Sequence, residues 1–128
     1  NVNLKGTVLK PNMILPGKDS KDKVSNEEIA KKTLECIKKN MPAEVPGVAF
    51  LSGGQSEIEA TRNLNEINKI NDTSFNFTFS YGRALQQAAL KTWLGKEENE
   101  KKAQDAFSHR ALMNKLAALG KWSSELEE

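Results

Sequence analysis

The stretch that most constrains the fold is Phe75-Asn76-Phe77-Thr78-Phe79-Ser80, in which aromatic and small polar residues alternate strictly. In an extended strand, successive side chains point to opposite faces, so the three phenylalanines share one face. Asn76, Thr78 and Ser80 then share the other face. The alternation predicts a β-strand over residues 75–80 whose aromatic face must be covered by other elements.

Two further strands are predicted upstream. Val48-Ala49-Phe50-Leu51 is a continuous apolar run, which is typical of a strand buried on both faces of a parallel sheet. Thr7-Val8-Leu9 favours an extended, half-buried backbone, and Pro11 cannot donate a hydrogen bond to a neighbouring strand. Lys10 is therefore expected at the carboxyl end of the first strand.

A first helix is predicted over residues 26–39. Ser25 and Glu28 have the spacing of a capping box, in which each side chain bonds the backbone N–H of the other residue. Ile29, Thr33, Cys36 and Ile37 then fall on one helical face. Cys36 is expected to be a small apolar residue on that buried face.

The later helices follow the same logic. Ser56 and Glu59 repeat the capping box, and the helix after them carries Ala60, Leu64, Ile67 and Asn71 on its inner face, with its other asparagines and its charged residues outside. Another helix is predicted to run from about residue 85 to Gly95, and a last long helical segment over 97–119. The acidic tail 122–128 is expected to fray.

Composition bounds the class of protein. The 128 residues suit one domain, and the net charge of +2 comes from 19 basic and 17 acidic side chains spread along the chain. That balance argues against a nucleic-acid or membrane partner. The single cysteine, Cys36, cannot form an internal disulfide, and no signal peptide or long apolar run precedes the polar start. We therefore expect a reduced, cytoplasmic protein. The only histidine, His109, has no partner at metal-ligand spacing and is expected to be a surface or packing residue.

The order of the elements predicts an α/β fold. Strands that alternate with helices form a parallel sheet with right-handed crossovers. Two architectures fit three such units: a short open sheet covered by helices, or part of a (β/α)8 barrel in which the phenylalanines pack against outer helices and Asn76, Thr78 and Ser80 line the interior.

In either architecture, function collects at the carboxyl ends of the strands. Three unusual motifs fall there: Lys10, Ser52-Gly53-Gly54 and Ser80-Tyr81-Gly82-Arg83. Glycines before a helix let backbone N–H groups approach an anion closely, and Arg83 adds a fixed positive charge. Taken singly, the glycines could form an ordinary turn and Arg83 could be a solvated surface residue. Their occurrence on consecutive strand ends favours a phosphate site.

Lys10 also has two interpretations. A lysine that leaves a strand usually extends its ammonium group into water. At the mouth of an apolar pocket it can instead lose its proton and act as an amine nucleophile. A phosphate bound at the neighbouring strand ends would hold a substrate carbonyl within reach of this amine.

These motifs carry a family resemblance. The segments 4–13 (LKGTVLKPNM), 45–57 (VPGVAFLSGGQSE), 79–87 (FSYGRALQQ) and 95–99 (GKEEN) resemble class I fructose-bisphosphate aldolases. The similarity runs from Leu4 to about Trp122 and covers the last third or so of a family member. It implies strands six to eight of the barrel with their helices, so that residues 1–128 would be the C-terminal part of a single barrel domain.

The resemblance implies reversible cleavage of fructose 1,6-bisphosphate to dihydroxyacetone phosphate and glyceraldehyde 3-phosphate, with no metal and no cofactor. Lys10 matches the Schiff-base lysine of the family. The positions that bind the ketose-side phosphate are matched by Ser52, Gly53, Gly54, Ser80, Gly82 and Arg83. Tyr81 is expected to position backbone rather than to react.

The resemblance also implies what the chain lacks. The acidic residues for proton transfer, the other active-site lysines and the basic residues for the second phosphate come from earlier strands of the family, and its C-terminal tyrosine is missing. We therefore expect the isolated chain to turn over little or no substrate. The family implies a homotetramer and possible binding to actin. The alternative is a non-catalytic module for sugar-phosphate or protein binding.

Overall fold

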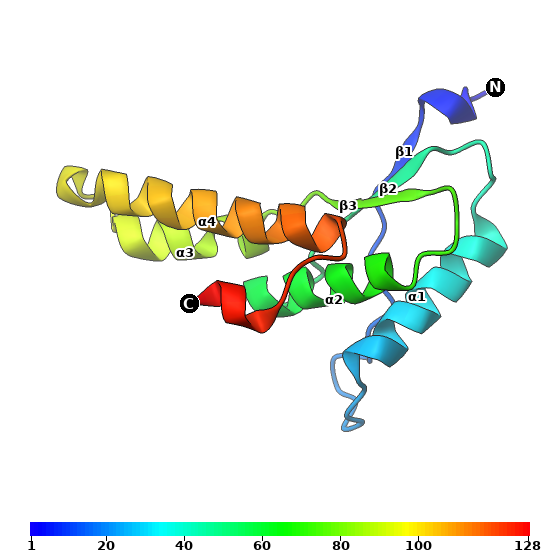
Figure 1. Cartoon of the computed structure of the whole chain (residues 1–128), viewed down its shortest axis with the longest axis horizontal. Helices are drawn as coiled ribbons and strands as arrows, with labels where there is room; N and C mark the ends of the chain where they lie inside the picture. Colours follow the sequence, from blue (N-terminus) through cyan, green and yellow to red (C-terminus); the bar gives the residue numbers. More distant parts are fainter.

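The computed structural model describes all residues, 1–128. Its main elements alternate as predicted, and three short 3₁₀ turns, η1 to η3, accompany them (Figure 1). In chain order they are η1 (Leu4–Gly6), β1 (Val8–Leu9), α1 (Asn26–Asn40), β2 (Gly47–Phe50), α2 (Glu57–Lys69), β3 (Asn76–Phe79), α3 (Arg83–Trp93), η2 (Glu97–Asn99), α4 (Glu100–Ala118) and η3 (Ser124–Glu127). None of the helices has both the length and the apolar character needed to cross a bilayer.

The three strands form one parallel sheet in the order β1-β2-β3. Leu9 pairs with Val48, which in turn pairs with Phe77, so these three side chains share a row and a face. The backbone pairing continues beyond the strands: Leu51 N donates to Pro11 O at 3.0 Å, and Ser80 N donates to Phe50 O at 2.8 Å. The carboxyl ends of all three strands thus lie at one edge of the sheet.

The aromatic face of the sheet is covered by helices, as the alternation predicts. Phe50 and Phe77 stack with ring centroids 5.8 Å apart, and both are buried with Leu64 and Ile67 of α2 in the core. Figure 1 shows α1 and α2 on one side of the sheet, while α3 and α4 run side by side away from it.

The opposite face of the sheet is open. Asn76, Thr78 and Ser80 are exposed there, which confirms the predicted division of the third strand into an aromatic and a polar face. The first strand is less covered than expected: only two residues pair, and Val8 is 62% and Leu9 40% exposed. The expectation of a half-buried strand fails because β1 is an edge strand with no neighbour on its outer side.

The helix starts differ in one detail. At Ser56, the hydroxyl accepts from Glu59 N at 3.2 Å and the Glu59 carboxylate accepts from Ser56 N at 2.9 Å, so the capping box is complete. At Ser25, the hydroxyl accepts from Glu28 N, but Glu28 does not return the bond. Both serines nevertheless mark the helix starts correctly.

Two predictions of burial are wrong. Cys36 is exposed, because it lies at the margin of the buried face of α1, beside a groove toward β1 that no element of this chain fills. Asn63 and Asn65 are buried rather than on the outer side of α2. Their amides have partners inside: Asn63 Nδ2 donates to Gln55 Oε1 at 2.7 Å, and Asn65 Oδ1 accepts from Trp122 N at 3.0 Å. Asn71, expected on the same helix, follows its end and donates to Phe75 O at 3.0 Å.

The prediction of a frayed tail is also wrong. Trp122 is buried, and η3 brings Glu127 back onto α4. There the buried Arg110 donates to both Glu127 oxygens, at 2.9 and 2.7 Å, and Trp122 Nε1 donates to Glu127 Oε1 at 2.8 Å. The acidic composition suggested a solvated end, whereas one of the acidic residues has a buried cation as its partner.

Candidate active site

Lys10 lies one residue beyond β1, at the edge of the sheet where the strands end. Val8 pairs with Gly47, and Gly47 pairs with Asn76, whose side chain is on the open face. Since side chains alternate along a strand, Lys10 is expected on the same open face as Val8. In this chain Lys10 is exposed to solvent, so the apolar surroundings that favour an amine nucleophile are not supplied by these residues.

The second strand ends in a turn shaped by glycines. Gly53 and Gly54 have φ values of +59° and +85°, in the region that residues with a Cβ rarely adopt. The turn closes with Gln55 N donating to Ser52 O at 3.1 Å, and the Gln55 side-chain amide donates to the same carbonyl at 2.9 Å. The N–H groups of Gly53 and Gly54 donate no hydrogen bond within the chain, so they are available to an anion.

The start of α2 itself is less favourable for an anion, because a carboxylate already lies there. The capping box occupies the N–H groups of Ser56 and Glu59, and it places a carboxylate there. Hydrogen bonds from the backbone N–H and from the hydroxyl of Ser56 hold the pKa of Glu59 below its ordinary value. The candidate donors to a phosphate at this strand end are therefore the N–H groups of the glycine turn before the helix.

The start of α3 has the opposite character. Gly82 precedes it without any side-chain cap, and the N–H groups of Arg83 and Ala84 donate to no atom of the chain. Arg83 is exposed and takes part in no ion pair. A helix start with free N–H groups and an adjacent guanidinium is a favourable place for a phosphate.

Tyr81 lies between these residues but faces the core. It is 6% exposed, and its hydroxyl donates to Ala60 O of α2 at 2.9 Å. Burial raises the pKa of the phenol far above its ordinary value. This geometry agrees with the expectation that Tyr81 positions the backbone of the strand end rather than reacting.

The structure thus brings the predicted residues to one edge of the sheet from three strand ends: Lys10, Ser52, Gly53, Gly54, Ser80, Gly82 and Arg83. Two neighbours of this group were not predicted from the sequence. Asn12 packs against Gly53, and Gln55 links the glycine turn to Asn63. Both residues stand inside segments that resemble the aldolase motifs, but no local spacing pattern identifies a side chain that contacts a second loop.

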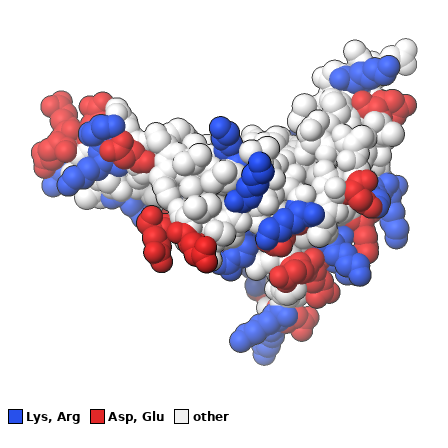
Figure 2. Space-filling model, in the orientation of Figure 1, with Lys and Arg blue, Asp and Glu red and all other residues white.

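Surface charge adds no competing site on the face drawn in Figure 2, where basic and acidic side chains are intermixed without an extended patch of either sign. No group of three His, Cys, Asp or Glu side chains is arranged to hold a metal ion. His109 has one acidic neighbour, with Nε2 3.7 Å from Glu127 Oε2, and belongs to the docked tail.

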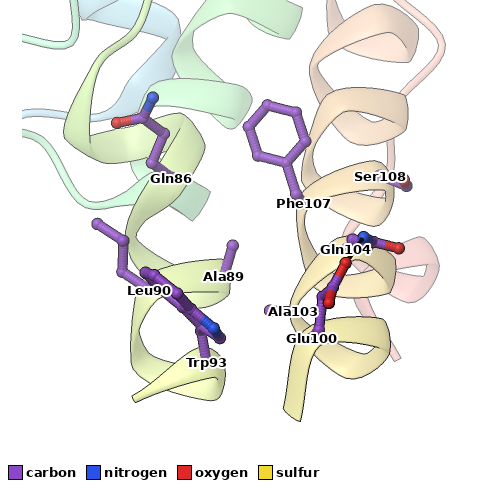
Figure 3. A pocket seen from close by; sticks show the side chains of 9 residues that line it. All are labelled: Gln86, Ala89, Leu90, Trp93, Glu100, Ala103, Gln104, Phe107 and Ser108. Atoms are coloured by element: carbon purple, nitrogen blue, oxygen red, sulfur yellow. Dashed lines mark hydrogen bonds between the residues drawn. The ribbon is translucent and has the colours of Figure 1, made fainter. Parts of the chain in front are cut away.

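A second opening lies between α3 and α4, away from the strand ends (Figure 3). It measures about 700 Å³, and Figure 3 shows Leu90 and Trp93 of α3 across from Ala103 and Phe107 of α4. Its only charged side chain is the carboxylate of Glu100. A groove with this lining suits apolar groups and does not suit a phosphorylated ligand.

Comparison with known proteins assigns the chain to a family. The family model described as fructose-bisphosphate aldolase class-I matches residues 1–128. Fructose-bisphosphate aldolase 4, cytosolic, of Arabidopsis thaliana is 55% identical over 99% of this chain and 33% of its own length. Fructose-bisphosphate aldolase 2, chloroplastic, of Pisum sativum is 51% identical over 99% of this chain and 36% of its own length.

The fold agrees with this assignment. A solved structure of fructose-bisphosphate aldolase from Plasmodium falciparum, in complex with TRAP and a small molecule inhibitor, superposes with a TM-score of 0.94 at 45% identity. The superposition covers 96% of this chain and 35% of that one. The three parallel strands and their helices are thus part of a TIM (β/α)8 barrel rather than a complete open sheet. The chain belongs to the class I fructose-bisphosphate aldolase family and spans about a third of the length of the relatives it matches.

Proposed function

We propose that the complete protein containing these 128 residues is a class I aldolase that reversibly cleaves fructose 1,6-bisphosphate to dihydroxyacetone phosphate and glyceraldehyde 3-phosphate. One observation carries the proposal. In this member of the family, Lys10 follows β1 at the same edge of the sheet as the ends of β2 and β3, where glycines precede a helix and backbone N–H groups are unpaired. Residues 1–128 are then the C-terminal part of a single barrel domain.

Lys10 is the proposed Schiff-base residue. Its unprotonated amine attacks the substrate ketone, and the addition product loses water to give an iminium ion. A carboxylate supplied by the remainder of the barrel takes the proton of the hydroxyl next to the breaking carbon–carbon bond, and the aldehyde product leaves. The iminium accepts the electron pair of that bond and becomes an enamine. Protonation of the enamine carbon and hydrolysis then release the ketone product and return the amine.

The ketose-side phosphate is proposed to bind between the second and third strand ends. The unpaired N–H groups of Gly53, Gly54 and Arg83 and the guanidinium of Arg83 support this role. Ser52, Ser80 and Gly82 complete the proposed site. Arg83 has no acidic partner in the chain, so its guanidinium is free to pair with a phosphate.

Reductive trapping tests the nucleophile in the complete protein. With dihydroxyacetone phosphate and borohydride present, we expect a stable adduct on Lys10, located by mass spectrometry of peptides. Lys10→Arg keeps the charge but forms no imine and should abolish the adduct. Lys5→Arg, an exposed lysine before the same strand, is the matched control and should leave the adduct intact. A wild-type adduct elsewhere would refute the assignment.

A second function remains a candidate because the solved relative from Plasmodium falciparum is in complex with TRAP. The complete protein could bind a protein partner, actin among them, or bind sugar phosphates without turnover. Calorimetry with fructose 1,6-bisphosphate separates these possibilities. Arg83→Ala should abolish binding if the anion site is formed, whereas Lys91→Ala, which removes an exposed cation near the other end of α3, should not. Binding without turnover in the wild type would favour the module over the enzyme.

The oligomeric state and the cellular location of the complete protein are inferred from its family alone. We propose a homotetramer for the complete protein. A cytosolic location is supported by cytosolic relatives from Arabidopsis thaliana and Pisum sativum, although chloroplastic relatives match at similar identity.

A further inference from the structure

The segment that follows Lys10 is joined to the glycine turn of the second strand. Pro11 O accepts a hydrogen bond from Leu51 N at 3.0 Å, directly before that turn. Met13 is 2% exposed, and its Sδ lies 3.6 Å from the Nε2 of Gln55, directly after the turn. The segment 11–13, which follows Lys10, therefore runs alongside the turn.

Asn12, between these two contacts, meets the turn at its centre. A Cβ built on Gly53 would lie 2.7 Å from Asn12 Cγ and 2.8 Å from Asn12 Nδ2, far closer than real Cβ contacts. Gly53 also has φ +59°. The close contact is made by the end of the Asn12 side chain, which is partly open to solvent and fills the space where a side chain of residue 53 would be.

On its other side, the turn is bonded to a chain of hydrogen-bonded side-chain amides. Gln55 Nε2 donates to Ser52 O at 2.9 Å, and Asn63 Nδ2 of α2 donates to Gln55 Oε1 at 2.7 Å. Asn26 Nδ2 of α1 donates to Asn63 Oδ1 at 2.6 Å. The turn therefore lies between these hydrogen-bonded amides and the side chain of Asn12, which makes no hydrogen bond within the chain.

We propose that Asn12 is a positioning residue: by filling the space against Gly53, it sets the separation between the amine of Lys10 and the phosphate-binding N–H groups of Gly53 and Gly54. This inference rests on the proposed function, because it assumes that a phosphate binds at the turn. Asn12 acts through its shape, since its amide has no partner in the chain. A misplacement of reacting groups by about 1 Å costs about 10²-fold in rate, so a spacer at this point has a measurable effect.

The test uses the complete protein and two probes that report different steps. Glycerol 3-phosphate has no carbonyl and cannot form an imine, so its dissociation constant, measured by calorimetry, reports the phosphate site alone. The rate of borohydride-trapped adduct formation with saturating dihydroxyacetone phosphate reports the approach of the ketone to Lys10. We expect Asn12→Ala to weaken glycerol 3-phosphate binding about tenfold and to slow trapping by up to about 100-fold.

Asn12→Leu separates shape from hydrogen bonding, because leucine has a similar branched shape but cannot donate or accept a hydrogen bond. If Asn12 is a spacer, Asn12→Leu should restore most of both readouts. The matched control is Asn76→Ala, which changes an exposed asparagine at the amino end of β3, away from the strand ends that carry the site. It should change neither the dissociation constant nor the trapping rate. Circular dichroism of each variant confirms that the fold is retained.

Three results would overturn the proposal: unchanged binding and trapping in Asn12→Ala, a loss in Asn12→Leu as large as in Asn12→Ala, or no binding of glycerol 3-phosphate by the wild type. The failure of the proposed function looks different, because it is a missing adduct on Lys10 in the wild type. Even without that adduct, the spacer role of Asn12 would be supported if Asn12→Ala weakened glycerol 3-phosphate binding and Asn12→Leu restored it.

Discussion

The phenol of Tyr81 illustrates how one residue within a predicted phosphate motif acquires a structural role. It stands between Ser80 and Gly82 in the sequence, yet its hydroxyl points into the core and donates to Ala60 O at 2.9 Å. Because burial raises its pKa, the phenol stays neutral across the physiological pH range and is a poor proton donor or acceptor for chemistry at the sheet edge.

We predict that Tyr81→Phe lowers the free energy of unfolding by about 1 to 2 kcal/mol, since it removes one buried hydrogen bond and leaves the ring in place. Denaturant unfolding of the complete protein measures this change. The adduct on Lys10 should form at the wild-type rate. A loss of trapping at full stability would instead identify Tyr81 as a participant in the reaction.

The glycine turn at the second strand end was predictable from the sequence, but the residue that packs against it was not. The sequence indicated a tight turn or a phosphate site at Gly53 and Gly54, and the left-handed φ values explain why glycine is needed. Asn12 could not be found in this way, because its contact with Gly53 joins residues 41 positions apart, and no local pattern encodes such a contact.

At the scale of elements, helix starts and strand faces were predicted well and buried polar residues poorly. Ser25 and Ser56 act on N–H groups three residues away, so a local pattern suffices to identify them. Asn65 was placed outside by its polarity, yet it is fully buried because its amide oxygen accepts from Trp122 N, 57 residues later. Burial of an amide depends on a partner that the local sequence does not reveal.

The docked tail is a second case of a distant partner. Burial opposes ionisation of Glu127, but hydrogen bonds from Arg110 and Trp122, together with the charges of Arg110 and His109, outweigh it and hold the pKa of Glu127 below its ordinary value. A lowered pKa means that the docked tail is more stable when Glu127 is ionised. The stabilisation is complete above the ordinary carboxyl pKa of about 4.3 and is lost as the pH falls through the lower value of the docked state.

We therefore predict that Glu127→Gln releases the tail at neutral pH and removes this acid dependence. The buried Arg110 then loses both hydrogen bonds to the carboxylate and keeps only the more distant Glu57, whose Oε1 lies 3.7 Å from its guanidinium. Fluorescence quenching of Trp122 by acrylamide, in a Trp93→Phe background of this chain, reports the release. Glu125→Gln changes an exposed carboxylate of the same turn and serves as the control. Equal quenching in Glu127→Gln and wild type would show that the ion pair does not hold the tail.

In the molecule as a whole, the sheet has open edges and an uncovered face. Both edges of the three-stranded sheet are unpaired, and its polar face is uncovered. In a (β/α)8 barrel these edges pair with further strands, and the polar face becomes the interior. Lys10, at the end of β1, is likewise exposed to solvent.

We predict that a protein consisting of these 128 residues alone turns over fructose 1,6-bisphosphate at a rate lower than the complete protein by at least about 10²- to 10⁴-fold, which is the contribution typical of general acid–base groups. A coupled assay for glyceraldehyde 3-phosphate measures this ratio. The Lys10→Arg variant of the same 128-residue chain sets the background rate. Turnover by the segment near that of the complete protein would place all of the proton-transfer groups within this chain.

The sequence by itself determined the α/β order, the faces of the third strand, the helix starts and the positions of the proposed nucleophile and phosphate turns. These features follow from patterns that repeat over two to four residues, because backbone geometry fixes which neighbours share a face. Only the tertiary structure decided the burial of Asn63, Asn65 and Arg110, the docking of the tail and the contact of Asn12 with Gly53. Each of these depends on a partner more than about fifteen residues away, and chain folding, rather than local pattern, brings such partners together.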